Sequence, residues 1–196
     1  MGKGRLEAFS DGVIAVIITI MVLELKTPHG NDLAALASVL PVFLSYVLSF
    51  VYVGIYWNNH HHMLHAVQRV NGRALWANLH LLFWLSLVPF VTGWANETHF
   101  ASLPVAIYGV VLLMAGVSYY ILERVLIAHH ARDSSLARAM GKDMKGVISV
   151  VIYAVAIALS QVNAWVSCGL YVLVAVMWFI PDPRIERTLP ENREST

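Results

Sequence analysis

Long apolar segments separated by short polar ones run through the chain from end to end. A helix needs about 20 mostly apolar residues to cross roughly 30 Å of hydrocarbon, and each of these segments reaches or approaches that length. Strands of a membrane barrel would instead show about ten residues of alternating polarity. The pattern therefore predicts an all-α integral membrane protein with six transmembrane helices. The predicted spans are 6–25, 33–57, 74–94, 101–122, 146–164 and 165–180.

These spans are predicted to form one membrane domain, residues 1–181. The prolines at 181 and 183 close the last span, because proline cannot continue a helix interior. Residues 182–196 are predicted to be a polar cytoplasmic tail. The charged connection 123–145 is predicted to form a short helix lying at the membrane surface.

Lysine and arginine are distributed unevenly between the two sides of this arrangement. If the N-terminus is cytoplasmic, Lys26 is the only one of the 13 Lys and Arg residues in an outer loop. Cytoplasmic loops of membrane proteins carry an excess of these residues. We therefore expect both termini to be cytoplasmic.

The composition agrees with a membrane protein and excludes several other classes. Residues of the AVILMFWYC set make up 58% of the chain, and charged residues only 13%. A soluble domain has about a quarter charged residues, so a soluble enzyme and a disordered chain are both excluded. A net charge of +1 does not suit a nucleic-acid partner. The single cysteine allows no intrachain disulfide.

The first span carries a carboxylate, Asp11, one and a half turns inside its start. A charge in hydrocarbon costs about 2.5 kcal/mol or more, so such a residue must be buried in protein or hydrated. It can be a functional group of an ion pathway. It can equally be a buried carboxylate that tethers helices, and the residues alone leave both interpretations open.

An apolar stripe runs along the same span, on a face turned away from Asp11. At 100° per residue, Val16, Ile20 and Leu23 align on this face, and Thr19 lies on its flank. The stripe can face lipid or another helix. In a symmetric oligomer it could instead line a pore, where stacked apolar rings gate by dewetting and a ring of Glu24 at the outer mouth attracts cations.

Three segments resemble a known family, the transmembrane protein 175 family of potassium channels. Residues 5–11, RLEAFSD, match its R-x-x-x-F-S-D signature at the start of the first helix. Residues 56–61, YWNNHH, resemble the Trp-x-x-His end of its second helix, and residues 75–79 and 87–90 resemble its third. The specific resemblance covers roughly residues 5 to 95.

The resemblance implies a tetrameric channel of the bacterial, single-repeat form in the inner (plasma) membrane. It implies a pore lined by the first helix and no carbonyl selectivity filter. By position, the constriction falls on Val16, Ile20 and Leu23, and Thr19 matches a hydroxyl position linked to potassium preference. The resemblance also implies an inner polar network. Its expected members are Arg5, Phe9, Ser10, Asp11, Trp57, His60 and Asn78.

The histidines offer a weaker alternative site. His61 and His65 have the i, i+4 spacing that lets two imidazoles reach one zinc ion. No cysteine and no H-E-x-x-H motif accompanies them, so a cluster at a helix end is the competing interpretation. His80 stands alone within the third span, where a hydrogen bond between helices is expected rather than a haem ligand.

The favoured hypothesis is a homotetrameric, potassium-preferring cation channel that conducts K⁺ and other monovalent cations without a cofactor. One alternative is a proton- or cation-coupled secondary transporter using Asp11. Transporters tend to show broken helices and paired repeats, which are not evident in this sequence. A membrane enzyme or redox subunit using histidines is the third hypothesis. It ranks last, because the histidines gather at one interface.

Overall fold

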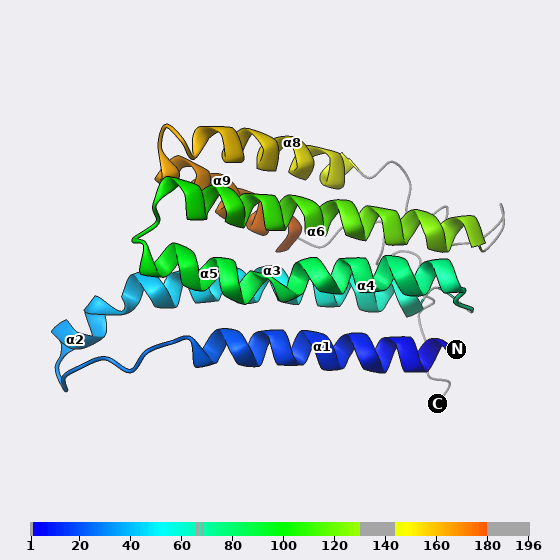
Figure 1. The fold of residues 1–196 in the computed structure, drawn as a ribbon, viewed down its shortest axis with the longest axis horizontal. Helices are drawn as coiled ribbons and strands as arrows, with labels where there is room; N and C mark the ends of the chain where they lie inside the picture. Colours follow the sequence, from blue (N-terminus) through cyan, green and yellow to red (C-terminus); the bar gives the residue numbers. More distant parts are fainter. Residues whose placement is uncertain (1, 66, 68, 130–143, 180–196) are drawn as a thin grey trace, which may run out of the picture.

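The computed structural model describes residues 2–65, 67, 69–129 and 144–179. In this part of the chain every regular element is helical, and the long helices lie along one axis (Figure 1). The helices are α1 (Lys3–Leu23), α2 (Leu33–Ser38), α3 (Leu40–His65), α4 (Gly72–Ser86), α5 (Val88–Glu97), α6 (Ser102–His129), α8 (Met144–Leu159) and α9 (Ala164–Phe179).

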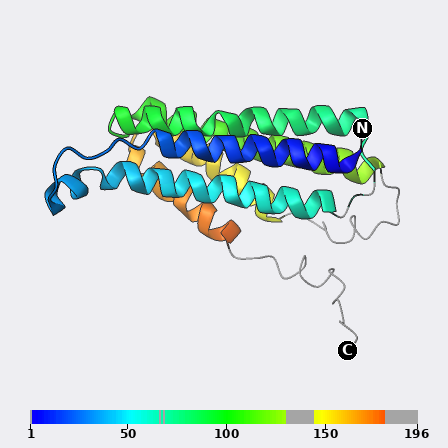
Figure 2. The same ribbon diagram turned by 90° about the horizontal axis from the view of Figure 1, so that it is seen from below.

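Successive long helices run in opposite directions, so the chain forms an up-and-down bundle. The N-terminus of α1 lies at one end of the bundle, and α2 projects beyond the other end (Figures 1 and 2). Four helical segments of the described residues are long and apolar enough to cross a membrane: α1, α3, α4 with α5, and α6. The apolar helices α8 and α9 are shorter, with 16 residues each.

The second predicted span differs from the structure at both ends. Its first residues form the separate short helix α2, which Asp32 caps by accepting a hydrogen bond from the Ala35 amide at 2.8 Å. Pro41 then lies in the first turn of α3, where a missing N–H costs nothing. At the other end, α3 continues to His65, eight residues beyond the predicted limit of 57. The histidine cluster is therefore part of the helix.

The third predicted span is divided in two at Leu87, where α4 ends and α5 begins. Pro89 lies in the first turn of α5, and its ring nitrogen has no hydrogen to donate to the preceding turn. The fourth span also continues further than predicted. Glu123 and Arg124 lie within α6, so the loop predicted for 123–145 begins later than expected. The remainder of that loop, 130–143, and the tail 182–196 lie outside the described residues.

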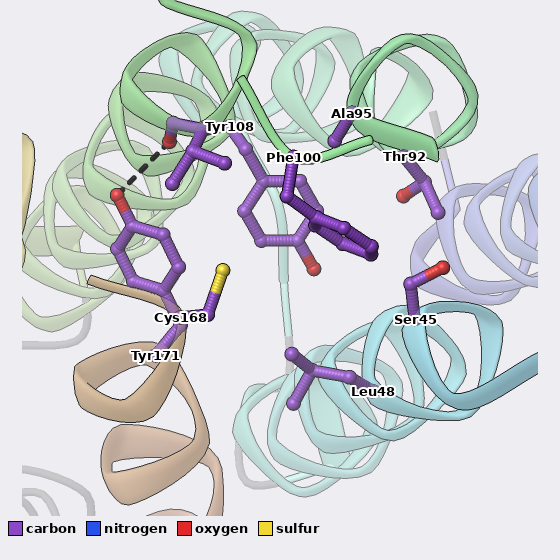
Figure 3. A pocket seen from close by; sticks show the side chains of 9 residues that line it. Ser45, Leu48, Thr92, Ala95, Phe100, Tyr108, Cys168 and Tyr171 are labelled. Atoms are coloured by element: carbon purple, nitrogen blue, oxygen red, sulfur yellow. Dashed lines mark hydrogen bonds between the residues drawn. The ribbon is translucent and has the colours of Figure 1, made fainter. Parts of the chain in front are cut away.

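Hydroxyl groups join the helices in the interior of the bundle. The Ser49 hydroxyl on α3 lies 2.8 Å from the Thr92 hydroxyl on α5 and 2.9 Å from the Tyr108 hydroxyl on α6. Beside them is a cavity of about 30 Å³, into which Tyr108 and Cys168 project (Figure 3). Tyr171 closes one side of this cavity by donating a hydrogen bond to the Val105 carbonyl at 3.1 Å. Such bonds hold helices together where apolar burial alone cannot.

The position of Tyr171 leads to a first testable prediction, at Gly109 on α6. A methyl group on Gly109 would overlap the Tyr171 hydroxyl and lie 2.8 Å from Cγ1 of Ile157. We expect Gly109→Ala to displace the fully buried Tyr171 and to cost about 1–3 kcal/mol of stability. The measurement is the thermal unfolding midpoint in detergent. Gly169→Ala is the control, because nothing lies within 4 Å of that added methyl; equal midpoints for the two variants would contradict the prediction.

Candidate functional site

The first helix has one buried face and one open face. Leu6, Ser10, Ile14, Ile17 and Met21 are buried, at the spacing of three and four residues that defines one side of a helix. This side packs against α3, α4 and α5.

The apolar stripe lies on the open face of α1. Val16 is 57% exposed, Ile20 44% and Leu23 76%. Val16 and Ile20 lie within α1, and Leu23 is its last residue. No helix of the described part of the chain covers the stripe.

Thr19 and Glu24 flank the stripe but differ in orientation. The Thr19 side chain is exposed, and its hydroxyl donates to the Ala15 carbonyl at 2.9 Å. Its oxygen keeps its acceptor lone pairs on the open side. Glu24 caps the C-terminal end of α1, and its Oε2 lies 3.7 Å from the point where a Cβ on Gly93 of α5 would be. The Glu24 carboxylate thus lies beside α5 rather than over the stripe.

A buried hydrogen-bond chain joins α1, α3 and α4 near the N-terminal end of the bundle. Asn78 donates from Nδ2 to the Ser10 hydroxyl at 2.9 Å, and its Oδ1 lies 2.7 Å from His60 Nε2. Because a carbonyl oxygen only accepts, His60 is the donor in this pair. Ser10 in turn donates to the Leu6 carbonyl at 2.9 Å. Ser10 and Asn78 are fully buried and His60 is 2% exposed. Water therefore cannot replace a lost hydrogen-bond partner of these side chains.

A second polar group lies on the exposed side. Trp57 Nε1 donates to Asp11 Oδ1 at 2.9 Å, and Trp57 is 44% exposed. The Trp57 ring stacks on His61 at 6.0 Å between centroids, and His61 stacks on His65 at 6.1 Å. The three rings form a column along α3. Asp11 attaches the open face of α1 to the end of this column.

The expected single network is therefore two separate groups, and Arg5 and Phe9 belong to neither. The Arg5 side chain is exposed, and Phe9 is 49% exposed. Helix geometry gives the reason, since neighbouring residues point about 100° apart. Ser10 faces the interior, whereas Asp11 is exposed, and Arg5 points about 140° away from Ser10.

His61 and His65 lie on one face of α3, where their rings stack at 6.1 Å between centroids. Within the described residues there is no group of three His, Cys, Asp or Glu side chains that could hold a metal ion. His80 forms the contact between helices expected from sequence. Its Nε2 accepts from Trp84 at 3.0 Å, which leaves Nδ1 to donate to the Ser118 hydroxyl on α6 at 3.1 Å.

One connection near the site was not predicted from sequence. Lys3 Nζ donates to the His65 carbonyl at 3.2 Å and lies 3.6 Å from Glu7 Oε1. This contact ties the first turn of α1 to the last turn of α3. The i, i+4 spacing of Lys3 and Glu7 is a visible signal in the sequence. The bond to His65 depends on where α3 ends, which the sequence pattern placed too early.

Comparison with known proteins shows which family this chain resembles. Residues 5–89 match the family described as endosomal/lysosomal potassium channel TMEM175. A protein of Chryseobacterium sp. (strain P1-3) named as a potassium channel is 55% identical over 192 residues, which cover 98% of this chain and 100% of that protein.

Two further relatives extend the comparison. The crystal structure of a lysosomal potassium-selective channel TMEM175 homolog from Chamaesiphon minutus is 30% identical, with a TM-score of 0.76. The similarity covers 90% of this chain and 96% of that one. A human protein named endosomal/lysosomal proton channel TMEM175 is 35% identical over 96 residues, which are 42% of this chain and 19% of that protein.

Proposed function

The chain belongs to the TMEM175 family, and on that premise we propose that it is a potassium-preferring cation channel whose pore is lined by α1 in a homotetramer. The observation that carries the proposal is the uncovered stripe of α1. Side chains at 16, 20 and 23 are large, apolar and exposed, and they lie off the face of α1 that packs against α3, α4 and α5. Four such helices around one axis would stack these side chains into three apolar rings.

A pore of this kind works without backbone carbonyl ligands. α1 is a continuous helix from Lys3 to Leu23, so its carbonyl groups are engaged within the helix. Apolar rings resist the passage of a fully hydrated ion. Potassium gives up its hydration water more easily than sodium. An apolar constriction should therefore favour potassium modestly. The Thr19 oxygen supplies acceptor lone pairs one helical turn from the Val16 and Leu23 rings.

We further propose six membrane crossings, formed by α1, α3, α4 with α5, α6, α8 and α9. The apolar character of α8 and α9 and their course along the bundle axis support this count (Figure 1). The excess of Lys and Arg near the N-terminal end of the bundle supports a cytoplasmic N-terminus. The relative matched over its full length comes from Chryseobacterium, a bacterium, which supports a multi-pass protein of the bacterial plasma membrane.

The experiment that tests the function is ion flux through the purified protein in liposomes. K⁺ and Na⁺ gradients are imposed in turn, and H⁺ flux is recorded because the matched human relative is named a proton channel. We expect passive K⁺ flux that exceeds Na⁺ flux and needs no second gradient. Transport of K⁺ strictly coupled to protons would instead support the transporter hypothesis, with Asp11 as the coupling group.

The proposed role of Thr19 gives a more local prediction. We expect Thr19→Val, which keeps the shape and removes the oxygen, to lower the K⁺/Na⁺ permeability ratio by about threefold or more, the effect of losing one weak oxygen ligand. The ratio is measured from reversal potentials in planar bilayers. Thr19→Ser retains the oxygen and is expected to keep most of the selectivity. An unchanged ratio in Thr19→Val would remove the hydroxyl from the selectivity mechanism.

A further inference from the structure

A cavity of about 280 Å³ lies away from α1, between α3, α6, α8 and the end of α9. We propose that this cavity binds an acyl chain of an anionic phospholipid from the leaflet on the side of the N-terminus, with the lipid phosphate held by Arg124 and Lys145. The site is separate from the proposed pore, and the inference does not depend on which ion the protein conducts.

Within the described residues, α9 fills the gap between α3 and the α6–α8 pair only in part. Tyr52 of α3 donates to the Tyr171 carbonyl of α9, so the two helices touch at the middle of α3. Of the described α9 residues, only Trp178 reaches the cavity wall. The opposing wall contains Gly116, where an added Cβ would meet nothing closer than the Tyr56 hydroxyl at 3.6 Å.

The wall is predominantly apolar, and three of its polar side chains already have hydrogen-bond partners. Trp178 Nε1 donates to the Ser149 hydroxyl at 2.8 Å, and Ser149 donates to the Lys145 carbonyl at 2.8 Å. Tyr119 donates to the Asn59 carbonyl at 3.3 Å. A hydrocarbon occupant fits this surface, since it leaves those hydrogen bonds intact. Val147 and Val151 line the cavity and are 65% and 57% exposed, so it is accessible from the outer side of α8.

Two cations mark the end of the cavity nearest the N-terminal side. The Arg124 guanidinium lies 4.8 Å from the centroid of the Tyr120 ring, and Tyr120 lines the cavity. Lys145 directly precedes Gly146, another lining residue, on the neighbouring helix α8. Basic groups beside an apolar gap between transmembrane helices match the chemistry of a phospholipid, whose phosphate lies at the membrane surface above its acyl chains. This pairing of charge and cavity selects an anionic lipid as the occupant.

The test uses the full-length protein in liposomes that contain a phosphatidylglycerol with a photoactivatable group in its acyl chain. Crosslinked peptides are identified by mass spectrometry. We expect labelling of the cavity segments 116–120 and 147–153. Gly116→Leu fills the cavity and should reduce that labelling by about fivefold or more. Gly169→Leu is the matched control, because Gly169 is exposed on α9 and nothing lies within 4 Å of an added Cβ.

The headgroup is tested by Arg124→Gln, with Arg73→Gln as a control at another exposed arginine on the same end of the bundle. Arg124→Gln should lower labelling by phosphatidylglycerol about fivefold and leave the matching phosphatidylcholine probe unchanged. Val150→Phe narrows the same cavity from the α8 side. This variant replaces Gly116→Leu in the labelling test if Gly116→Leu does not fold. The proposal is overturned if folded cavity variants label like Gly169→Leu, or if the two lipid probes label the segments equally.

Discussion

Replacing Ile20 by asparagine is expected to raise cation flux about tenfold, equivalent to about 1.4 kcal/mol of barrier, and to bring the K⁺/Na⁺ permeability ratio toward one. Ile20 is the central residue of the stripe and 44% exposed, so an amide fits there without disturbing the packed face of α1. In a pore, one asparagine side chain from each subunit would form a polar ring that keeps water in the constriction. This ring would remove the dewetting barrier. The measurement is K⁺ and Na⁺ flux into liposomes under matched gradients.

A control separates pore lining from a general effect of polar substitution. Val172 on α9 is 46% exposed, which closely matches Ile20, and it lies outside the stripe. Val172→Asn should therefore leave flux and selectivity unchanged. Leu23→Asn, one ring further along, should act in the same direction as Ile20→Asn. If Ile20→Asn conducts like the wild type and like Val172→Asn, the pore does not pass along this face of α1.

Replacing Asn78 by leucine should strongly destabilise the folded chain, by about 2–4 kcal/mol. Leucine has a similar shape but leaves the buried His60 ring N–H without an acceptor and takes the donor away from Ser10. The destabilisation follows because water cannot reach these groups to replace the lost partner. Thermal unfolding in detergent measures the effect, and the yield of folded protein gives a second reading.

Two comparisons give this prediction its specificity. Asn58→Leu removes an exposed amide from the neighbouring α3 and should leave the unfolding midpoint within a few degrees of the wild type. Asp11→Ala removes the exposed partner of Trp57 and should spare the midpoint, while it reduces tetramer yield or conduction. Equal midpoints for Asn78→Leu and Asn58→Leu would mean that the buried chain does not hold the helices together. A midpoint loss in Asp11→Ala equal to that of Asn78→Leu would mean that the two groups act as one.

The division of the polar residues into two groups explains why these variants should differ. Ser10 and Asp11 are adjacent in sequence and point about 100° apart on the helix. One side chain supports the interior of a single chain, and the other lies on the face left open. The family signature contains both residues side by side. Only the placement of α3 and α4 around α1 shows that they have different partners.

The apolar pattern of the sequence determined the fold class and the course of the first helix. Continuous apolar runs must become helices in a membrane, because each helix satisfies its own backbone hydrogen bonds without neighbours. The stripe of α1 could also be derived from sequence, since helix periodicity alone fixes which residues share a face. The helix ends were less predictable. α3 and α6 continue beyond their apolar runs, because the backbone hydrogen bonds of a helix do not require apolar side chains.

The tertiary structure alone decided which face of each helix is covered, and by what. The stripe at Val16, Ile20 and Leu23 is open because α3, α4 and α5 pack on the other side of α1, and a helical wheel carries no information about neighbours. The lipid-sized cavity depends in the same way on where α9 lies relative to α3 and α8. Periodicity acts within one helix, whereas burial, hydrogen-bond partners and cavities arise between helices that are distant in the chain.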